Sequence, residues 1–127
     1  MFNIVDVLKP YELNFDDRLF ILSIISEQSK SRKIINQQFT ESEWRVIKIL
    51  IATFPSAAKY DQIYAAYHDV SEEDAQRILL KAKQDEKYDD EIRPIRRCIQ
   101  SVKRKLQLFR WNIDVIRNRG YLLSLPV

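Results

Sequence analysis

Residues 92–119 decide the fold: Ile92-Arg-Pro-Ile-Arg-Arg-Cys-Ile-Gln-Ser-Val-Lys-Arg-Lys-Leu-Gln-Leu-Phe-Arg-Trp-Asn-Ile-Asp-Val-Ile-Arg-Asn-Arg119. This stretch holds nine Lys or Arg residues and one acid, Asp114, so its net charge is +8. The residues before it hold 12 basic and 17 acidic residues, a net charge of −5. A small protein that separates its charge in this way is suited to meet a polyanion with one face.

The first half of the stretch has the period of an amphipathic helix. Apolar residues recur at i, i+4, i+7 and i+11 and form one stripe: Ile95, Ile99, Val102 and Leu106. Pro94 suits the first position of a helix, so we expect the helix to begin there. At about 100° per residue the opposite side carries Arg93, Arg97, Gln100 and Arg104, and one edge carries Arg96 and Lys103. The core face and the basic face are therefore opposite each other.

The second half changes to the two-residue period of β-strands. Apolar residues alternate on both sides of a turn: Ile113 and Val115 before it, Tyr121, Leu123 and Leu125 after it. The turn is Arg117-Asn-Arg-Gly120. The pattern predicts a hairpin over 111–125 whose turn carries Arg117 and Arg119.

Residues 1–39 predict a small antiparallel sheet. Strands are expected at Tyr11–Phe15, Leu19–Ile25 and Lys33–Phe39, with an Asp16-Asp17 turn and a polar connection over Glu27–Arg32. A short buried helix over Leu19–Ser26 is the alternative for the second strand.

Residues 40–108 predict a helical core. Thr40 and Glu43 form a capping box, which opens a helix that ends at Pro55-Ser56. A shorter helix is expected over Tyr60–Tyr67. Ser71-Glu-Glu-Asp74 is expected to form a second capping box, in which each side chain accepts from a backbone amide, and to open a further amphipathic helix. We expect Asp89-Asp90-Glu91 to close that segment with negative charge, and either to cap the basic helix that follows or to keep the segment off DNA by repulsion.

Composition excludes several classes of function. At 127 residues the chain is long enough for one domain with its own core. One glycine, Gly120, excludes glycine-rich phosphate loops, and the single His68 has no partners at the spacing of a metal site or a catalytic triad. We therefore expect no enzymatic activity, no metal and no cofactor. The single Cys98 forms no internal disulfide and is expected to be a small buried residue in a cytoplasmic protein.

The order of helix, helix, basic helix and basic hairpin describes an α+β winged helix-turn-helix. An α-helix fits the major groove of B-DNA, where Arg and Gln read base edges. Arginines of a hairpin can enter a narrow minor groove, and other cations contact phosphates. The residues expected to face double-stranded DNA are Arg93, Arg96, Arg97, Gln100, Lys103, Arg104, Arg117 and Arg119. Phosphate contact remains the alternative to base contact for Arg97 and Gln100. For Arg119 the alternatives to minor-groove contact are phosphate contact and a structural ion pair.

Four motifs resemble the OmpR/PhoB-type winged-helix domain of bacterial transcription regulators over about residues 10–127. They are Tyr11-Glu-Leu-Asn-Phe-Asp-Asp-Arg18, Phe39-Thr40-x-x-Glu43, Ile99-Gln-Ser-Val-Lys-Arg-Lys-Leu106 and Ile113-Asp-Val-Ile-Arg-Asn-Arg-Gly-Tyr-Leu-Leu123. The Arg119-Gly120-Tyr121 version of the last motif is most similar to the ToxR/CadC branch. The chain departs from the family in the longer connection over residues 68–91, which holds an extra helix, and in Arg117-Asn118 at the wing.

The resemblance implies an N-terminal antiparallel sheet, three main helices and a C-terminal hairpin wing. It further implies RNA polymerase as a partner through residues 68–91, and a homodimer on tandem half-sites. For the ToxR/CadC branch it implies a membrane tether beyond this chain, which would make this the cytoplasmic domain of an inner-membrane protein.

Three other interpretations of the basic face remain open. In the first interpretation the basic face is a solvated surface of the protein without a partner. In the second the domain is a protein-interaction module that uses the extra helix, residues 71–87, together with the basic face. In the third it is a membrane-surface module, although its apolar stripe is needed for the core. Trp44 and Trp111 are expected to pack in the core, and His68 to lie at a helix end.

Overall fold

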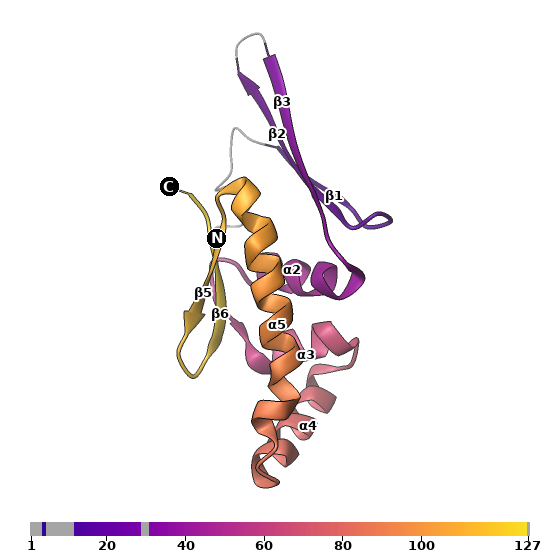
Figure 1. The fold of residues 1–127 in the computed structure, drawn as a ribbon, viewed down its shortest axis with the longest axis vertical. Helices are drawn as coiled ribbons and strands as arrows, with labels where there is room; N and C mark the ends of the chain where they lie inside the picture. The colour runs from indigo at the N-terminus through magenta and orange to yellow at the C-terminus, as the bar shows by residue number, and fades with distance from the viewer. Residues whose placement is uncertain (1–3, 5–11, 29–30, 127) are drawn as a thin grey trace.

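The computed structural model describes residue 4 and residues 12–28 and 31–126. Within these residues the chain is α+β. A three-stranded antiparallel sheet precedes a group of helices, and a hairpin follows them. Figure 1 shows the N-terminal sheet projecting at one end of the molecule, while the longest helix runs along the body beside the hairpin.

The N-terminal sheet consists of β1 (Glu12–Asp16), β2 (Ile21–Gln28) and β3 (Ser31–Gln38) in the order β1-β2-β3. Three strands are present as predicted, but their bounds differ: Leu19 and Phe20 belong to the turn before β2, and Phe39 follows β3. Tyr11 lies outside the described residues, and the helical alternative over Leu19–Ser26 is wrong. The predicted polar connection over Glu27–Arg32 is also wrong, because backbone pairing continues to Gln28 opposite Ser31. Arg32 is exposed there, and an antiparallel strand accepts polar residues on a face that meets water.

The helices begin largely where their caps predict. They are α2 (Glu41–Thr53), α3 (Tyr60–His68), α4 (Glu72–Gln84) and α5 (Tyr88–Leu106). The Thr40–Glu43 capping box is present in both directions. At α4 the Ser71 hydroxyl accepts from the amide of Asp74 at 3.1 Å, but the Asp74 carboxylate accepts from Arg77 at 2.8 Å in place of the expected return bond.

The predicted start of the basic helix at Pro94 is wrong, because α5 begins six residues earlier, at Tyr88, and Pro94 lies inside it. Asp89, Asp90 and Glu91 therefore do not close α4; they form the first turn of α5, which agrees with the expectation that they cap the basic helix. Acids are favoured at a helix N-terminus, and Ile92 extends the buried stripe. These gains outweigh the single hydrogen bond that a proline removes from the helix.

A second sheet joins the C-terminal hairpin to a short strand that the sequence did not predict. Its order is β4 (Ala58–Lys59), β6 (Gly120–Ser124) and β5 (Asn112–Ile116), and the 3-10 turn η1 (Gln107–Phe109) connects α5 to β5. At Gly120, φ is +157° and a Cβ would lie 1.8 Å from the Ala58 carbonyl oxygen. Only glycine therefore allows β4 and β6 to approach so closely. Val115, which shares the alternating pattern of the hairpin, is 65% exposed because it lies beyond the edge of the core.

The core lies between α2, α3, α5 and the hairpin. Its largest fully buried side chains include Ile47, Leu50, Ile63, Ile95, Leu106, Trp111, Ile113 and Leu123. The extra helix α4 is part of the same body, since its buried face (Ala75, Leu79 and Ala82) packs toward α3 and α5. Among the helices described, none has both the length and the apolar content required to cross a membrane.

Candidate nucleic-acid interface

The outward face of α5 carries the predicted polar set. The four predicted stripe residues are buried, as are Ile92 and Cys98. On the other side Arg93, Arg96, Arg97, Gln100 and Arg104 are exposed, and Lys103 is half-buried. The predicted amphipathic division of this helix is therefore confirmed, over a longer helix than expected.

The hairpin turn carries the second predicted set. Arg117 and Arg119 are exposed, and the amide of Arg119 donates to the carbonyl of Ile116 at 3.0 Å, which closes the turn. β5 contacts α5, and Figure 1 shows the hairpin lying along this helix. The two basic sets are thus on neighbouring elements.

The early start of α5 divides the predicted residues into two groups. Arg93 pairs with Asp90 at 3.2 Å, and Arg96 pairs with Asp89 at 3.4 Å, both within the first two turns or so of the helix. Arg97, Arg104, Arg117 and Arg119 have no acid within ion-pair distance among the residues that the structure describes. The second half of α5 and the hairpin turn therefore hold the free positive charge, and the first turn of α5 holds negative charge.

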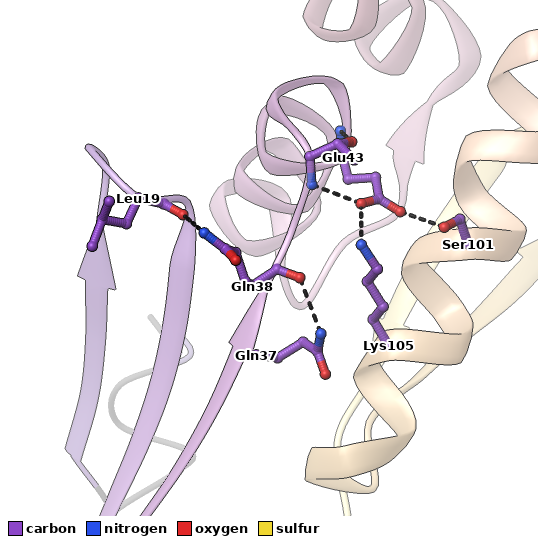
Figure 2. Close-up of polar contacts among 7 residues, drawn as sticks. Leu19, Gln37, Gln38, Glu43, Ser101 and Lys105 are labelled. Atoms are coloured by element: carbon purple, nitrogen blue, oxygen red, sulfur yellow. Dashed lines mark hydrogen bonds and ion pairs between the residues drawn. The ribbon is translucent and has the colours of Figure 1, made fainter.

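Sequence reasoning missed the buried ion pair that ties α5 to α2. Glu43 is only 4% exposed, and its carboxylate accepts from Lys105 Nζ at 2.6 Å, from the amide of Thr40 at 2.8 Å and from the hydroxyl of Ser101 (Figure 2). The N-terminal cap of α2 and two turns of α5 thus share one carboxylate. Lys105 belongs to the basic run but points to this contact. Its position on the edge of the apolar stripe was the available signal, but nothing in the sequence named its partner 62 residues away.

The same contact sets the charge states around it. Burial opposes ionisation of Glu43, but hydrogen bonds from Lys105, Ser101 and Thr40 outweigh it, so the pKa of Glu43 falls below its ordinary value of 4.5. Burial, with the nearby Glu43 charge, raises the pKa of the Cys98 thiol to about 11. Cys98 is therefore a buried neutral thiol, as expected, and the structure gives it no features of a reactive cysteine.

The aromatic residues and His68 are placed as predicted. Trp44 is 3% exposed and Trp111 is 1% exposed, so neither indole offers a face for stacking on a base. His68 is the exposed last residue of α3, where its ring lies 4.3 Å from the ring of Tyr64 and 4.8 Å from that of Tyr67.

The candidate interface is therefore a face of exposed side chains. It consists of Arg97, Gln100, Lys103 and Arg104 on α5 and Arg117 and Arg119 on the hairpin, with Arg93 and Arg96 paired at its edge. Comparisons with protein-family models, with curated proteins and with solved structures found no match to this chain.

Proposed function

We propose that this protein is the sequence-specific DNA-binding domain of a bacterial transcription regulator, with a winged helix-turn-helix arrangement. The second half of α5 enters the major groove of double-stranded DNA, and the hairpin turn reaches the adjacent minor groove. The observation that carries the proposal is the group of free arginines, Arg97, Arg104, Arg117 and Arg119, which lack acid partners within the described part of the chain. Burial of the opposite side of α5 in the core leaves this face free for a partner.

The geometry of α5 supports base contacts by its second half. Arg97 and Arg104 are seven residues apart, which is about 10 Å along a helix, or about three base-pair steps. Gln100 lies between them on the same face. Arg pairs with guanine edges and Gln with adenine edges, so these three side chains suit readout of a short sequence. Lys103 and Arg104 also suit phosphate contact, which fixes the register of the helix on the duplex.

The acidic first turn limits which residues take part. Asp89 and Asp90 would face phosphates unfavourably if the N-terminal end of α5 entered the groove. In this protein Arg93 and Arg96 contact DNA only if they exchange these carboxylates for phosphates. We therefore assign the first-turn arginines a secondary role, and place the main contacts on Arg97, Gln100, Arg104 and the hairpin.

The resemblance to OmpR/PhoB-type domains supports the further partners. In this proposal RNA polymerase binds residues 68–91. The apolar face of α4 is buried in the core, and its exposed face presents charged side chains such as Arg77 and Lys81. A homodimer on tandem half-sites and a membrane tether beyond this chain belong to the same proposal.

Selection of bound duplexes from a random pool tests the proposal. The protein is incubated with duplexes of about 20 random base pairs, and bound DNA is recovered and sequenced over several rounds. We expect enrichment of one short motif, and binding to it that falls steeply between about 50 and about 200 mM salt. A protein-interaction module predicts neither enrichment nor salt-sensitive binding.

Substitutions locate the interface. In the Arg97→Ala/Arg119→Ala variant, each change should cost about 1–3 kcal/mol of binding to the selected duplex. The matched control is Arg77→Ala, which removes an exposed arginine from α4, where it pairs with Asp74. Fluorescence anisotropy with a labelled duplex measures all three proteins. Equal affinity of the double variant and the wild type would refute the proposal.

A further inference from the structure

An open cleft of about 760 Å³ is lined by the hairpin turn, the start of α3, one side of α4 and the first residue of α5. Clefts of about 300–1,000 Å³ hold small organic ligands. Its walls come from segments that are far apart in the sequence, including Lys59 of β4, Lys83 of α4 and Arg119 of the hairpin turn. The fold therefore brings these residues together, which no local pattern in the sequence indicates.

Cations dominate the charge of the cleft. Lys59, Lys83 and Arg119 have no carboxylate within ion-pair distance in the described part of the chain. Asp61 is the one acid among the described residues that line the cleft, and its two carboxylate oxygens accept from the Gln62 amide and the Gln76 side chain, each at 2.9 Å. Three positive charges against one leave the cleft attractive to an anion.

Part of the lining of the same cleft, called its floor below, is apolar and aromatic. It consists of Leu79, which is 6% exposed, and of the half-buried Tyr60 and Tyr88. Lys83 Nζ is 5.1 Å from the centre of the Tyr88 ring, so a cation sits directly against an aromatic wall. The three cations of the cleft, together with its apolar floor, suit a ligand with both a charged head and a hydrophobic body.

We propose that this cleft binds a small organic anion whose carboxylate or sulfonate head pairs with Lys83 and Arg119 and whose apolar body lies on Leu79, Tyr60 and Tyr88. A DNA phosphate would use the cations but leave the apolar floor uncovered, so the lining favours a small molecule. This inference goes beyond the proposed function, and the cleft can be tested in the absence of DNA.

Anilinonaphthalene sulfonate is a suitable probe, because it joins a sulfonate to an aromatic body and fluoresces when it leaves water. We expect saturable binding to the folded protein with one site per chain. Decanoate should displace the dye, and decanol, which has the same chain without the charge, should displace it far less. Binding at one site with this preference requires both the cations and the floor.

Two pairs of variants locate the dye. Lys83→Gln and Arg119→Gln should each weaken binding about fivefold to tenfold, as loss of one charge-assisted contact does. The controls are Lys81→Gln, on the same helix but outside the lining, and Arg117→Gln, in the same turn but outside the lining. Both controls should change the affinity less than about twofold.

Several outcomes would overturn the proposal. One is the absence of saturable binding, and another is an equal loss in the control variants, which would indicate a general charge effect. Displacement by a DNA duplex but not by decanoate would assign the cleft to a DNA phosphate. Urea unfolding of each variant shows that the fold is kept, because this dye also binds partly unfolded chains. The titrations with the dye, decanoate and decanol contain no DNA, so this proposal and the DNA-binding proposal fail separately.

Discussion

Replacing Glu43 with glutamine removes the charge that ties α5 to α2 while keeping the shape of the side chain. The carboxylate is buried and accepts hydrogen bonds from Lys105, Ser101 and Thr40. Glutamine keeps one acceptor oxygen for the Thr40 amide. It loses the negative charge that faces Lys105, and it adds an NH2 group that needs an acceptor of its own.

The size of the effect follows from the burial of the two partners. Removing one partner of a fully buried ion pair costs about 3–5 kcal/mol. The Lys105 side chain is 31% exposed, so its ammonium group can recover part of its hydration, while Glu43 cannot. With one acceptor kept, we expect the free energy of unfolding to fall by about 2 kcal/mol, and Tm by about 6–10 °C.

The pH dependence gives an independent check on the same contact. Because folding lowers the pKa of Glu43 below 4.5, the unfolded chain binds the proton more readily than the folded chain does. The stabilisation is fully present above pH 4.5 and is lost as the pH falls through the folded-state pKa. The difference between wild type and Glu43→Gln should therefore be largest near neutral pH and shrink on acidification below 4.5.

Urea unfolding followed by circular dichroism, at neutral pH and at acidic pH, measures both effects. The matched control is Glu41→Gln, which removes an exposed carboxylate from the same turn, where it pairs with Arg45 at 3.1 Å. An exposed pair of this kind contributes at most about 1 kcal/mol. Equal losses in the two variants, or a difference that does not change with pH, would refute the structural role given to Glu43.

Three further predictions test other parts of the structure. The Asp89→Asn/Asp90→Asn variant removes the carboxylates that pair with Arg93 and Arg96, so both arginines become free to contact phosphates. Binding to a selected duplex should tighten, and the slope of log affinity against log salt should steepen by about 2. Unchanged affinity in anisotropy titrations would contradict this expectation. Gly120→Ala should lower the free energy of unfolding by about 3 kcal/mol or more, because the new Cβ would lie 1.8 Å from the Ala58 carbonyl oxygen. A urea midpoint equal to that of the wild type would show that β4 and β6 separate at little cost. The Cys98 thiol, whose pKa burial raises to about 11, should react with Ellman's reagent far more slowly in the folded protein at pH 8 than in urea, and fast reaction of the folded chain would show that α5 opens.

Local signals in the sequence predicted the elements and the face of the candidate interface. The stripe of Ile95, Ile99 and Val102 defined which side of α5 meets the core, and so which side is free. The Thr40–Glu43 capping box defined the start of α2. Both features depend on residues within a few turns of one another, where spacing alone carries the information.

The errors and omissions have two different physical origins. Pro94 predicts too late a start for α5, because the acids and Ile92 that precede it already continue the helical pattern. The Glu43–Lys105 pair and the cleft were out of reach, because they join residues from distant parts of the chain. Which cations stay free for a partner depends on such contacts.

The pairing of β4 with β6 also constrains the order in which the chain can fold during synthesis. Ala58 lies opposite Tyr121, and the core is closed by Trp111, Ile113 and Leu123, which follow all four helices in the sequence and are therefore synthesised after them. The β1–β3 meander needs only neighbouring residues, but the helices lack part of their core until the hairpin emerges. We expect a chain that stops at Arg110 to be cleaved rapidly by proteases while the full chain resists. The helix proposed to read DNA would then gain its full core contacts only after the hairpin has been synthesised.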